Sequence, residues 1–436
     1  MNNRRFSNHW GFVLACVGSA VGMANVWGFP YRMGTMGGGA FLIAYLIFVT
    51  LFSVVGLSAE YAIGRRTGTG TLGSYEYAWR QAGYKKVGKY LGWIPLLGSL
   101  CIALGYSVIV AYVLKALHQA LTGSLMNVDP EPWFNGFALT PYSVPVYHGV
   151  ILILVALSIS VGATSIEKTN KVMMPLFFIL FCILAIRTFF LPGAWEGYHF
   201  MFKPEWSKLK DPMIWIYAMG QAFFSLSVTG SGMIVYGAYL PKDEDVLKGA
   251  TNTAFFDTIA AVVAALVILP ACFAYGVDPK GGPGLLFVTL PTILQDIYFG
   301  RIFAIILFTA VVFGGIASLQ NMFEVVTESF HRAFPKISRN LWMILLPLLC
   351  FVIGINMEAI YQWGPWMDFV SIYIIPIGAL LGAVTWYWIL PKKELLDEME
   401  TGAASMPSWW HPLGRYVYVP LALVLTAIAL VKGISF

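Results

Sequence analysis

The sequence predicts an all-α integral membrane protein with eleven transmembrane helices. Only 11% of its 436 residues are charged and 58% are hydrophobic, whereas soluble domains carry about 25% charged residues. Apolar runs near the roughly 20 residues that cross a bilayer recur along the chain, with no soluble domain between them. Their approximate bounds are 10–33, 40–64, 90–121, 146–162, 170–191, 213–240, 251–275, 300–330, 341–356, 366–390 and 413–435.

The first apolar run follows a short polar arm, residues 1–9, and no small-residue cleavage site comes after it. We therefore expect a retained helix and not a signal peptide. Basic residues lie on this arm and on alternate loops, which places those loops in the cytoplasm. The N-terminus is thus expected inside the cell and the C-terminus outside. These basic residues are Arg4, Arg5, Arg65, Arg66, Arg80, Lys85, Lys86, Lys89, Lys168, Lys171, Lys242, Lys248, Arg332, Lys336, Arg339, Lys392 and Lys393.

The net charge, the cysteines and the histidines give no indication of a nucleic-acid-binding protein, a metal site or an enzyme. The net charge of +5 follows from the topology and gives no reason to expect a nucleic-acid partner. The cysteines lie in apolar runs without metal-ligand spacing, as core residues do, and the histidines are scattered. No nucleophile, metal cluster or pair of acids on one side indicates an enzyme. The cysteines are Cys16, Cys101, Cys182, Cys272 and Cys350.

The first apolar run contains a stretch too rich in glycine and small residues for an ordinary spanning helix. It reads GSAVGMANVWGFP, residues 18–30, and we expect the helix to break there. A break at membrane depth leaves backbone groups without water, which is tolerated where they face a cavity or a ligand. The amides around Gly22, Met23 and Ala24 would lie at the positive end of the second half-helix, where they can receive a carboxylate.

A second break is expected in the sixth run, where FFSLSVTGSG occupies residues 223–232. The two breaks are five helices apart, as an inverted-topology repeat requires, and such paired breaks indicate a binding site near the midplane. The repeats would be residues 10–191 and 213–390 of a single domain, 1–436, with residues 413–435 as helix eleven. The alternative is that glycine and serine only let the helices pack closely.

Further motifs follow in order along nearly the whole chain, and on them it resembles the neurotransmitter:sodium symporter family, specifically its bacterial amino-acid transporters. The resemblance implies a LeuT-type fold of two inverted five-helix repeats, and eleven helices is a variant seen among bacterial members. It also implies a transporter of the bacterial cytoplasmic membrane, expected to be a monomer or weak dimer. The motifs are GSAVGMANVWGFP (18–30), GGGAF (37–41), EYAIGR (60–65), GYSVI (105–109), IEK (166–168), MMP (173–175), LPGAWEG (191–197) and GQAFFSLSVTGSG (220–232).

The resemblance implies how a substrate would bind. In the family, a tyrosine at the position of Tyr106 binds the substrate carboxylate. A glycine at the position of Gly22 accompanies amino acids, whereas an aspartate there accompanies amines. Phe224 would cover the site as a lid. The carbonyl-rich ends expected around the amino group are those at Ser19, Ala20, Phe224 and Ser225.

The side-chain pocket implied by the resemblance departs from the family pattern at three positions. The family commonly has a large residue at the position of Gly230 and an apolar one at Ser318, and Phe313 brings bulk where the family keeps a small hydroxyl residue. An apolar or aromatic amino acid is favoured, with a small polar one left open. The pocket residues are Ser19, Ile102, Phe224, Ser227, Gly230, Phe313, Gly314 and Ser318.

The first sodium site of the family keeps all its oxygen donors at the matching positions Ala20, Asn25, Ser225 and Asp257. A carboxylate at the bilayer centre costs about 2.5–3.5 kcal/mol without a partner, so Asp257 favours a bound cation. Its negative charge, where the family often has asparagine, would make chloride unnecessary. The alternative is an aspartate at a helix end near the cytoplasm.

The second sodium site of the family lacks part of its ligand set here. The resemblance implies carbonyl ligands at Gly18, Val21 and Ala310, but the expected threonine and serine align with Phe313 and Gly314, which have no side-chain oxygen. We expect this second sodium to be weak or absent. Coupling would then run through one sodium site, or through protons.

The gates of the family are also altered. Its outer gate pairs an arginine with an aspartate, and these positions hold Gly28 and Asp368, so this ion pair cannot form. Closure would depend on Tyr106, Phe224, Gln221 and Trp27. The inner latch would comprise Arg4 or Arg5 with Tyr239, Gln320 and Glu328.

Two carboxylates in apolar runs, Glu60 and Glu324, are candidates for proton carriage, because burial favours the protonated form of a carboxyl group. Glu60 has the alternative role of bracing the broken helices. The function expected from all these features is cation-coupled, chloride-independent import of an amino acid or a related zwitterion by alternating access. A proton-coupled or sodium-independent transporter, or a sensor that binds without transport, remains an alternative, and a channel is disfavoured.

Overall fold

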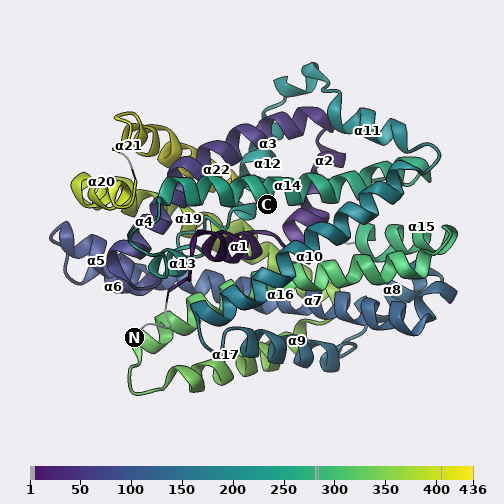
Figure 1. Ribbon diagram of the computed structural model, residues 1–436, viewed down its shortest axis with the longest axis horizontal. Helices are drawn as coiled ribbons and strands as arrows, with labels where there is room; N and C mark the ends of the chain where they lie inside the picture. Colours follow the sequence, from purple (N-terminus) through teal and green to yellow (C-terminus); the bar gives the residue numbers. More distant parts are fainter. Residues whose placement is uncertain (1–4, 280–281, 283, 404, 436) are drawn as a thin grey trace.

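The computed structural model describes residues 5–279, 282, 284–403 and 405–435. Within them the chain is helical and holds no strand. Long helices run side by side across Figure 1, where α16 lies against α7 and α10. The α-helices are α1 (His9–Ala20), α2 (Phe29–Thr35), α3 (Gly39–Phe52), α4 (Ser58–Thr67), α5 (Thr71–Gln81), α6 (Val87–Leu91), α7 (Trp93–Thr122), α8 (Pro130–Ala138), α9 (Pro145–Ser158), α10 (Ala163–Phe189), α11 (Ala194–Phe202), α12 (Pro212–Ser225), α13 (Ile234–Ala238), α14 (Val246–Ala274), α15 (Leu290–Asp296), α16 (Gly300–Ala333), α17 (Arg339–Gly354), α18 (Ile360–Phe369), α19 (Ile375–Val384), α20 (Lys392–Glu400), α21 (Trp410–Leu413) and α22 (Val419–Lys432).

Short π-helical and 3₁₀ segments connect several of these α-helices into longer continuous helices. π-Helical turns cover Ala24–Gly28, Ser53–Leu57, Leu285–Thr289, Val370–Ile374, Thr385–Ile389 and Gly414–Tyr418. Tighter 3₁₀ turns cover Ser124–Asn127, Trp206–Lys210 and Ile355–Met357.

The predicted fold class is confirmed. In the described part of the chain, 8 helical stretches are long and apolar enough to cross a membrane, and α1 with Ala24–Thr35 makes a further span bent by 59°. The remaining predicted spans are α9, of 14 residues, and the pair α12 and α13. Residues 226–233 between α12 and α13 are not helical.

Polar side chains start several of the spanning helices by accepting hydrogen bonds from otherwise unpaired first-turn amides. Asn8 Oδ1 accepts from the Gly11 amide at 2.8 Å before α1. Asp211 accepts from Met213 at 2.9 Å before α12. These caps place the start of each broken span at a defined residue.

Five short helices lie outside the apolar runs that the sequence analysis identified. These are α5, α8, α11, α15 and α20, of 7 to 11 residues each. They are too short to reach the length that crosses a bilayer, so hydropathy alone does not reveal them.

Both broken spans lie in the middle of the bundle. Helix α1 packs against α10, α14 and α16, and α13 packs against α4. The approach of α13 to α4 is close enough to need glycine on both sides. A Cβ on Gly64 would lie 2.0 Å from the Ile234 carbonyl oxygen, and one on Gly237 would lie 2.4 Å from that of Tyr61. Small residues therefore let the second break dock directly on α4.

Candidate binding site at the helix breaks

The first break exposes backbone amides whose partners are side chains. Helix α1 ends at Ala20, and Val21 has an extended conformation with ψ 115°. The Gly22 amide donates to Asn25 Oδ1 at 3.0 Å, and the Met23 amide donates to the Tyr106 hydroxyl at 2.8 Å. A side chain at Gly22 has no room, because its Cβ would lie 2.2 Å from that hydroxyl oxygen.

The second break is held by one carboxylate. Glu60 of α4 is buried, with 1% of its surface exposed. Its Oε1 accepts from the Gly230 amide at 2.9 Å and its Oε2 from the Met233 amide at 3.0 Å. Both oxygens therefore bind backbone that the break leaves free. This geometry matches the bracing role that the sequence analysis considered for Glu60.

A cavity of about 40 Å³ lies between the two breaks. Nine of the predicted site residues line it: Ser19, Ala20, Gly22, Ala24, Ile102, Tyr106, Phe224, Ser227 and Ser318. The sequence analysis missed five lining residues: Ser99, Thr229, Gly232, Asn321 and Met322.

Two expected determinants of pocket shape lie elsewhere. Gly230 has φ 78°, and a Cβ there would lie 2.2 Å from the Gly378 carbonyl oxygen, so this glycine serves the contact with α19. Phe313 is half-buried on α16 and is not among the residues that line the cavity. Met23 lines a larger cavity on the other side of the break.

Asn25, Ser225 and Asp257 come together in a fully buried cluster. Asp257 Oδ1 accepts from Asn25 Nδ2 at 2.7 Å, and its Oδ2 accepts from the Ser225 hydroxyl at 2.6 Å. Tyr45, which the sequence analysis missed, points its hydroxyl at both Ser225 and Asp257, 3.4 Å and 3.5 Å away. Asp257 lies well inside α14, not at a helix end. The carboxylate and hydroxyl oxygens of Asp257 and Ser225 are donors that suit a hard cation, whereas the Asn25 amide oxygen accepts from the Gly22 amide and its nitrogen faces them.

At the positions of the second family site, the Val21 carbonyl has another partner. It accepts from the Ser318 hydroxyl at 3.1 Å. Gly314 faces the same carbonyl, since a Cβ there would lie 3.6 Å from the Val21 oxygen. A Cβ on Gly18 would lie 2.0 Å from Asn170 Oδ1. Side chains of the protein thus lie against Gly18 and Val21, two of the three residues that were expected to hold an ion.

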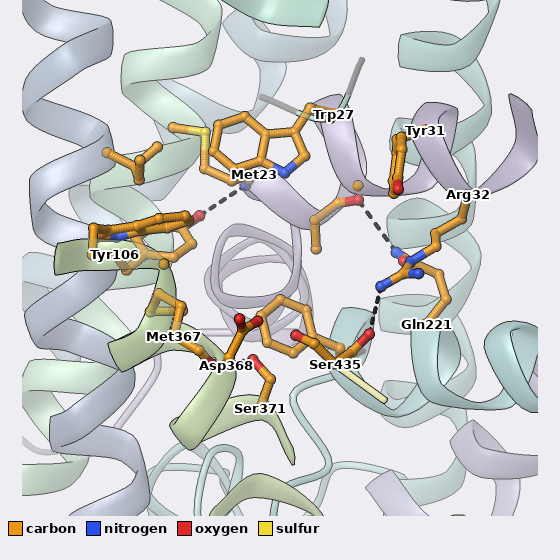
Figure 2. Close-up of a pocket in the computed structure, with 17 residues that line it drawn as sticks. Met23, Trp27, Tyr31, Arg32, Tyr106, Gln221, Met367, Asp368, Ser371 and Ser435 are labelled. Carbon is orange, nitrogen blue, oxygen red and sulfur yellow. Dashed lines mark hydrogen bonds between the residues drawn. The ribbon is translucent and has the colours of Figure 1, made fainter. Parts of the chain in front are cut away.

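A cavity of about 350 Å³ opens on one side of the first break (Figure 2). We call this cavity the vestibule. It is lined by the residues expected at the outer gate: Trp27, Gly28, Tyr106, Gln221, Phe224 and Asp368. Gln221 Nε2 donates to the Ala24 carbonyl at 3.2 Å.

The vestibule also contains an arginine that the sequence analysis missed. Arg32 Nη2 donates to the Ser435 carbonyl at 2.7 Å, and its guanidinium lies 4.6 Å from the centre of the Tyr217 ring. Figure 2 shows Arg32, Ser435 and Asp368 around the same cavity. In the described residues no ion pair joins Arg32 to Asp368.

On the opposite side, the described residues of the expected inner latch are not hydrogen-bonded to one another. Glu328 accepts from the Gly70 amide at 2.8 Å, and Gln320 Nε2 donates to Thr169 Oγ1 at 2.8 Å. Tyr239 donates instead to Glu324. Arg5 is exposed and lines a cavity of about 650 Å³ with Tyr239 and Glu328, and Arg4 lies outside the described residues.

Glu324 has a cationic partner that the sequence analysis did not identify. Arg339 Nη2 of α17 donates to Glu324 Oε2 at 2.6 Å and to the Ile159 carbonyl at 2.9 Å. Glu324 is fully buried, so its charge is compensated by Arg339. This pair ties α16 to α17 and to the end of α9.

Two interrupted spans that meet around a small cavity, with a buried carboxylate cluster beside it, define a secondary transporter of the LeuT type. The chain belongs to the sodium:neurotransmitter symporter family, whose model matches residues 3–136 and 139–435. It is therefore a multi-pass membrane transporter of a sodium-dependent family.

Individual relatives agree with this assignment. An uncharacterized sodium-dependent transporter of Bacillus subtilis, YhdH, is 32% identical over 98% of this chain and 97% of its own length. The sodium-dependent serotonin transporter of Drosophila melanogaster is 25% identical over 94% of this chain and 74% of its own length. Among solved structures, MhsT in complex with L-phenylalanine superposes with a TM-score of 0.87 at 32% identity, over 98% of this chain and 99% of MhsT.

Proposed function

We propose that this protein imports a hydrophobic amino acid with sodium through a single sodium site and without chloride. The observation that carries the proposal is the bond between the Met23 amide and the Tyr106 hydroxyl, 2.8 Å long, at the edge of the cavity between the breaks. Both groups can donate to one carboxylate, which would replace the bond between them. The L-phenylalanine in the MhsT structure supports a hydrophobic amino acid as the substrate.

The sodium ion would take oxygens from Ala20, Asn25, Ser225 and Asp257, together with the substrate carboxylate. The last three side chains are already gathered, and the Asn25 amide would have to turn, because its oxygen accepts from the Gly22 amide. When the cation is bound, the Asp257 carboxylate would supply the negative charge that balances it, so the site would need no chloride.

The loss of the second sodium site is supported by the crowding around the first break. A hydroxyl at the position of Gly314 would be close to the Val21 carbonyl, but glycine offers none, and Ser318 donates to that carbonyl instead. A cation there would have to break the bond between Ser318 and Val21, and Phe313 and Gly314 would offer it no side-chain oxygen.

The same proposal includes the topology. Residues 10–191 and 213–390 would be inverted repeats, with the N-terminus in the cytoplasm of a bacterial cell. A reporter enzyme active only outside the cytoplasmic membrane, fused after residue 435, should be active. An inactive reporter at that end, with an active one on the N-terminal arm, would reverse this topology.

A thermal-shift screen of amino acids and related amines, with and without sodium, tests the ligand class and the ion dependence together. A ligand at 100 times its Kd should stabilise the protein by about 2.7 kcal/mol. We expect stabilisation by L-phenylalanine or another hydrophobic amino acid only when sodium is present, and equally in chloride and gluconate salts. Stabilisation by amines alone, or a chloride requirement, would contradict the proposal.

Counterflow in proteoliposomes separates a transporter from a sensor. Vesicles loaded with unlabelled amino acid should accumulate the labelled one by exchange. A sensor of the same fold would bind the amino acid in the thermal-shift screen and yet show no exchange.

A further inference from the structure

Asn321 of α16 brings an unpaired hydrogen-bond acceptor to the cavity between the two breaks. The residue lines this cavity and is buried, with 3% of its surface exposed. Its side-chain oxygen, Oδ1, has no hydrogen-bond partner, which is unusual for a polar atom in a protein interior. Among the described residues that line the cavity, Asn321 alone has a buried side-chain nitrogen or oxygen without a partner.

The neighbours of Asn321 fix which atom of its amide is free. Asn321 Nδ2 donates to the Ser19 hydroxyl oxygen, and that hydroxyl donates in turn to Met233 Sδ at 3.6 Å. Because Ser19 directs its proton at the sulfur, its oxygen is left to accept from the amide nitrogen. The free atom is therefore the amide oxygen, which can only accept, so its missing partner is a hydrogen-bond donor.

The hydroxyl groups in the cavity wall do not supply this donor. Ser318 donates to a carbonyl of the first break at 3.1 Å, and the hydroxyls of Ser99 and Ser231 bond each other at 2.5 Å. Ser227 and Thr229 of the second break carry further hydroxyls, and neither bonds the free amide oxygen. A donor for this oxygen therefore has to come from a molecule inside the cavity.

The position of Asn321 suits the side chain of an amino acid. The carboxylate position proposed above lies between the Met23 amide and the Tyr106 hydroxyl. Ser318 lies beside it, because a Cβ on Gly22 would lie 2.2 Å from the Tyr106 hydroxyl oxygen and 2.4 Å from Ser318 Oγ. Asn321 follows Ser318 by three residues, which places it on the same face of α16, about 4.5 Å further along the helix axis. An amino acid held by its carboxylate at Tyr106 can therefore reach Asn321 with its side chain.

The amino group of such a substrate has other acceptors. It is attached to the carbon next to the carboxylate, and α1 ends nearby at Ala20, where the last carbonyl groups of the helix have no partner within it. The cavity wall also contains the apolar side chains of Ile102, Phe224 and Met322. The side chain of the substrate would thus meet apolar groups together with one unpaired acceptor.

We propose that Asn321 selects, among hydrophobic amino acids, those whose side chain carries a hydrogen-bond donor, either O–H or N–H. A purely apolar side chain leaves Oδ1 unpaired and shielded from water, which is costly for a buried acceptor. A side chain with one donor removes that cost, and sites built to bond a substrate hydroxyl discriminate strongly against the analogue that lacks it. The inference rests on the proposed function, because it takes the cavity as the amino-acid site, and it narrows the class of substrate.

Thermal-shift titrations of the full-length protein in sodium test the proposal with two matched pairs, L-tyrosine against L-phenylalanine and L-threonine against L-valine. In the pair that binds more tightly, the member with the hydroxyl should reach half-maximal stabilisation at a concentration at least about tenfold lower. Asn321→Leu keeps the approximate size of the side chain without its acceptor, and it should abolish this preference by weakening the binding of the hydroxyl member alone. Asn135→Leu, at an exposed asparagine of α8, is the matched control and should keep the preference.

Equal affinities within the pair, as expected where water bonds Oδ1, would overturn the proposal. So would a preference that Asn321→Leu retains or that Asn135→Leu loses. If the amino group of the substrate were the partner of Oδ1, Asn321→Leu would weaken both members alike, and this result would also overturn it. If Asn321→Leu does not fold, as judged by size-exclusion chromatography, Asn321→Ala replaces it with the same expectation. Equal binding within a pair leaves the proposed function intact, whereas no binding by any amino acid refutes both.

Discussion

The two helix breaks differ in what satisfies their free backbone groups. At the first break, the partners are Tyr106 and Asn25, neutral side chains whose bonds a substrate carboxylate or a cation can replace. At the second, the partner is the Glu60 carboxylate, buried and bonded through both oxygens. The first break is thus held by neutral side chains, which fits the exchange of partners that we propose for it, and the second is held by a buried carboxylate.

The largest effect is expected when the Glu60 carboxylate, which holds the second break, is removed. Glu60→Ala leaves the Gly230 and Met233 amides without partners inside the bundle. Each unsatisfied buried donor costs about 1–3 kcal/mol, so we expect a loss of about 2–6 kcal/mol in the free energy of unfolding, measured by thermal unfolding in detergent. Glu76→Ala, at a partly exposed carboxylate paired with Arg332, should have little effect. A stable Glu60→Ala variant would show that the brace is dispensable.

The next largest effect is expected at the buried cluster of Asn25, Ser225 and Asp257, to which both broken spans contribute a residue. Asp257→Asn removes the buried negative charge but keeps the size of the side chain. We expect at least about a tenfold higher sodium concentration for half-maximal stabilisation, equal to about 1.4 kcal/mol, from thermal shifts in a sodium series. Asp397→Asn, at an exposed aspartate on α20, serves as the control. An unchanged sodium dependence of Asp257→Asn would remove Asp257 from the site.

A finer test concerns the exchangeable bond at the first break. Tyr106→Phe removes the hydroxyl that bonds the Met23 amide. Since a hydrogen bond to a charged group contributes about 1.5–3 kcal/mol, amino-acid affinity should fall about tenfold or more in a binding assay, with folding maintained. Tyr298→Phe, at a tyrosine that is 78% exposed, should bind normally. Equal affinities would mean that the carboxylate binds elsewhere.

The smallest expected effect concerns Ser318. Ser318→Ala frees the Val21 carbonyl, and we expect a loss of about 1 kcal/mol in the free energy of unfolding without a change in the sodium dependence. Ser124→Ala, at an exposed serine, is the matched control. A sodium dependence that becomes steeper in Ser318→Ala would indicate that the hydroxyl occupies a functional second ion site.

Much of the candidate site was predictable because its signals are local. Runs of glycine and serine predicted both breaks. The residues expected at the first cation site also lie together, as Asn25, Ser225 and Asp257 show. The hydrogen-bond partners of the buried carboxylates could not be predicted from the sequence. Tyr45 and Arg339 lie in ordinary apolar or basic contexts, and nothing near them in sequence indicates that they bond Asp257 and Glu324.

By itself, the sequence determined that this protein spans the membrane many times, that two spans are interrupted, and which family it resembles, because hydrophobicity and helix-breaking residues act over short stretches of chain. Only the tertiary structure decided which groups complete each buried polar cluster. Glu60 meets Gly230 across 170 positions, and Glu358 meets Val144 across 214. Because the hydrocarbon core of a membrane offers no hydrogen bonds, each buried polar atom needs a partner wherever the packing of helices brings one, and that packing depends on the whole chain.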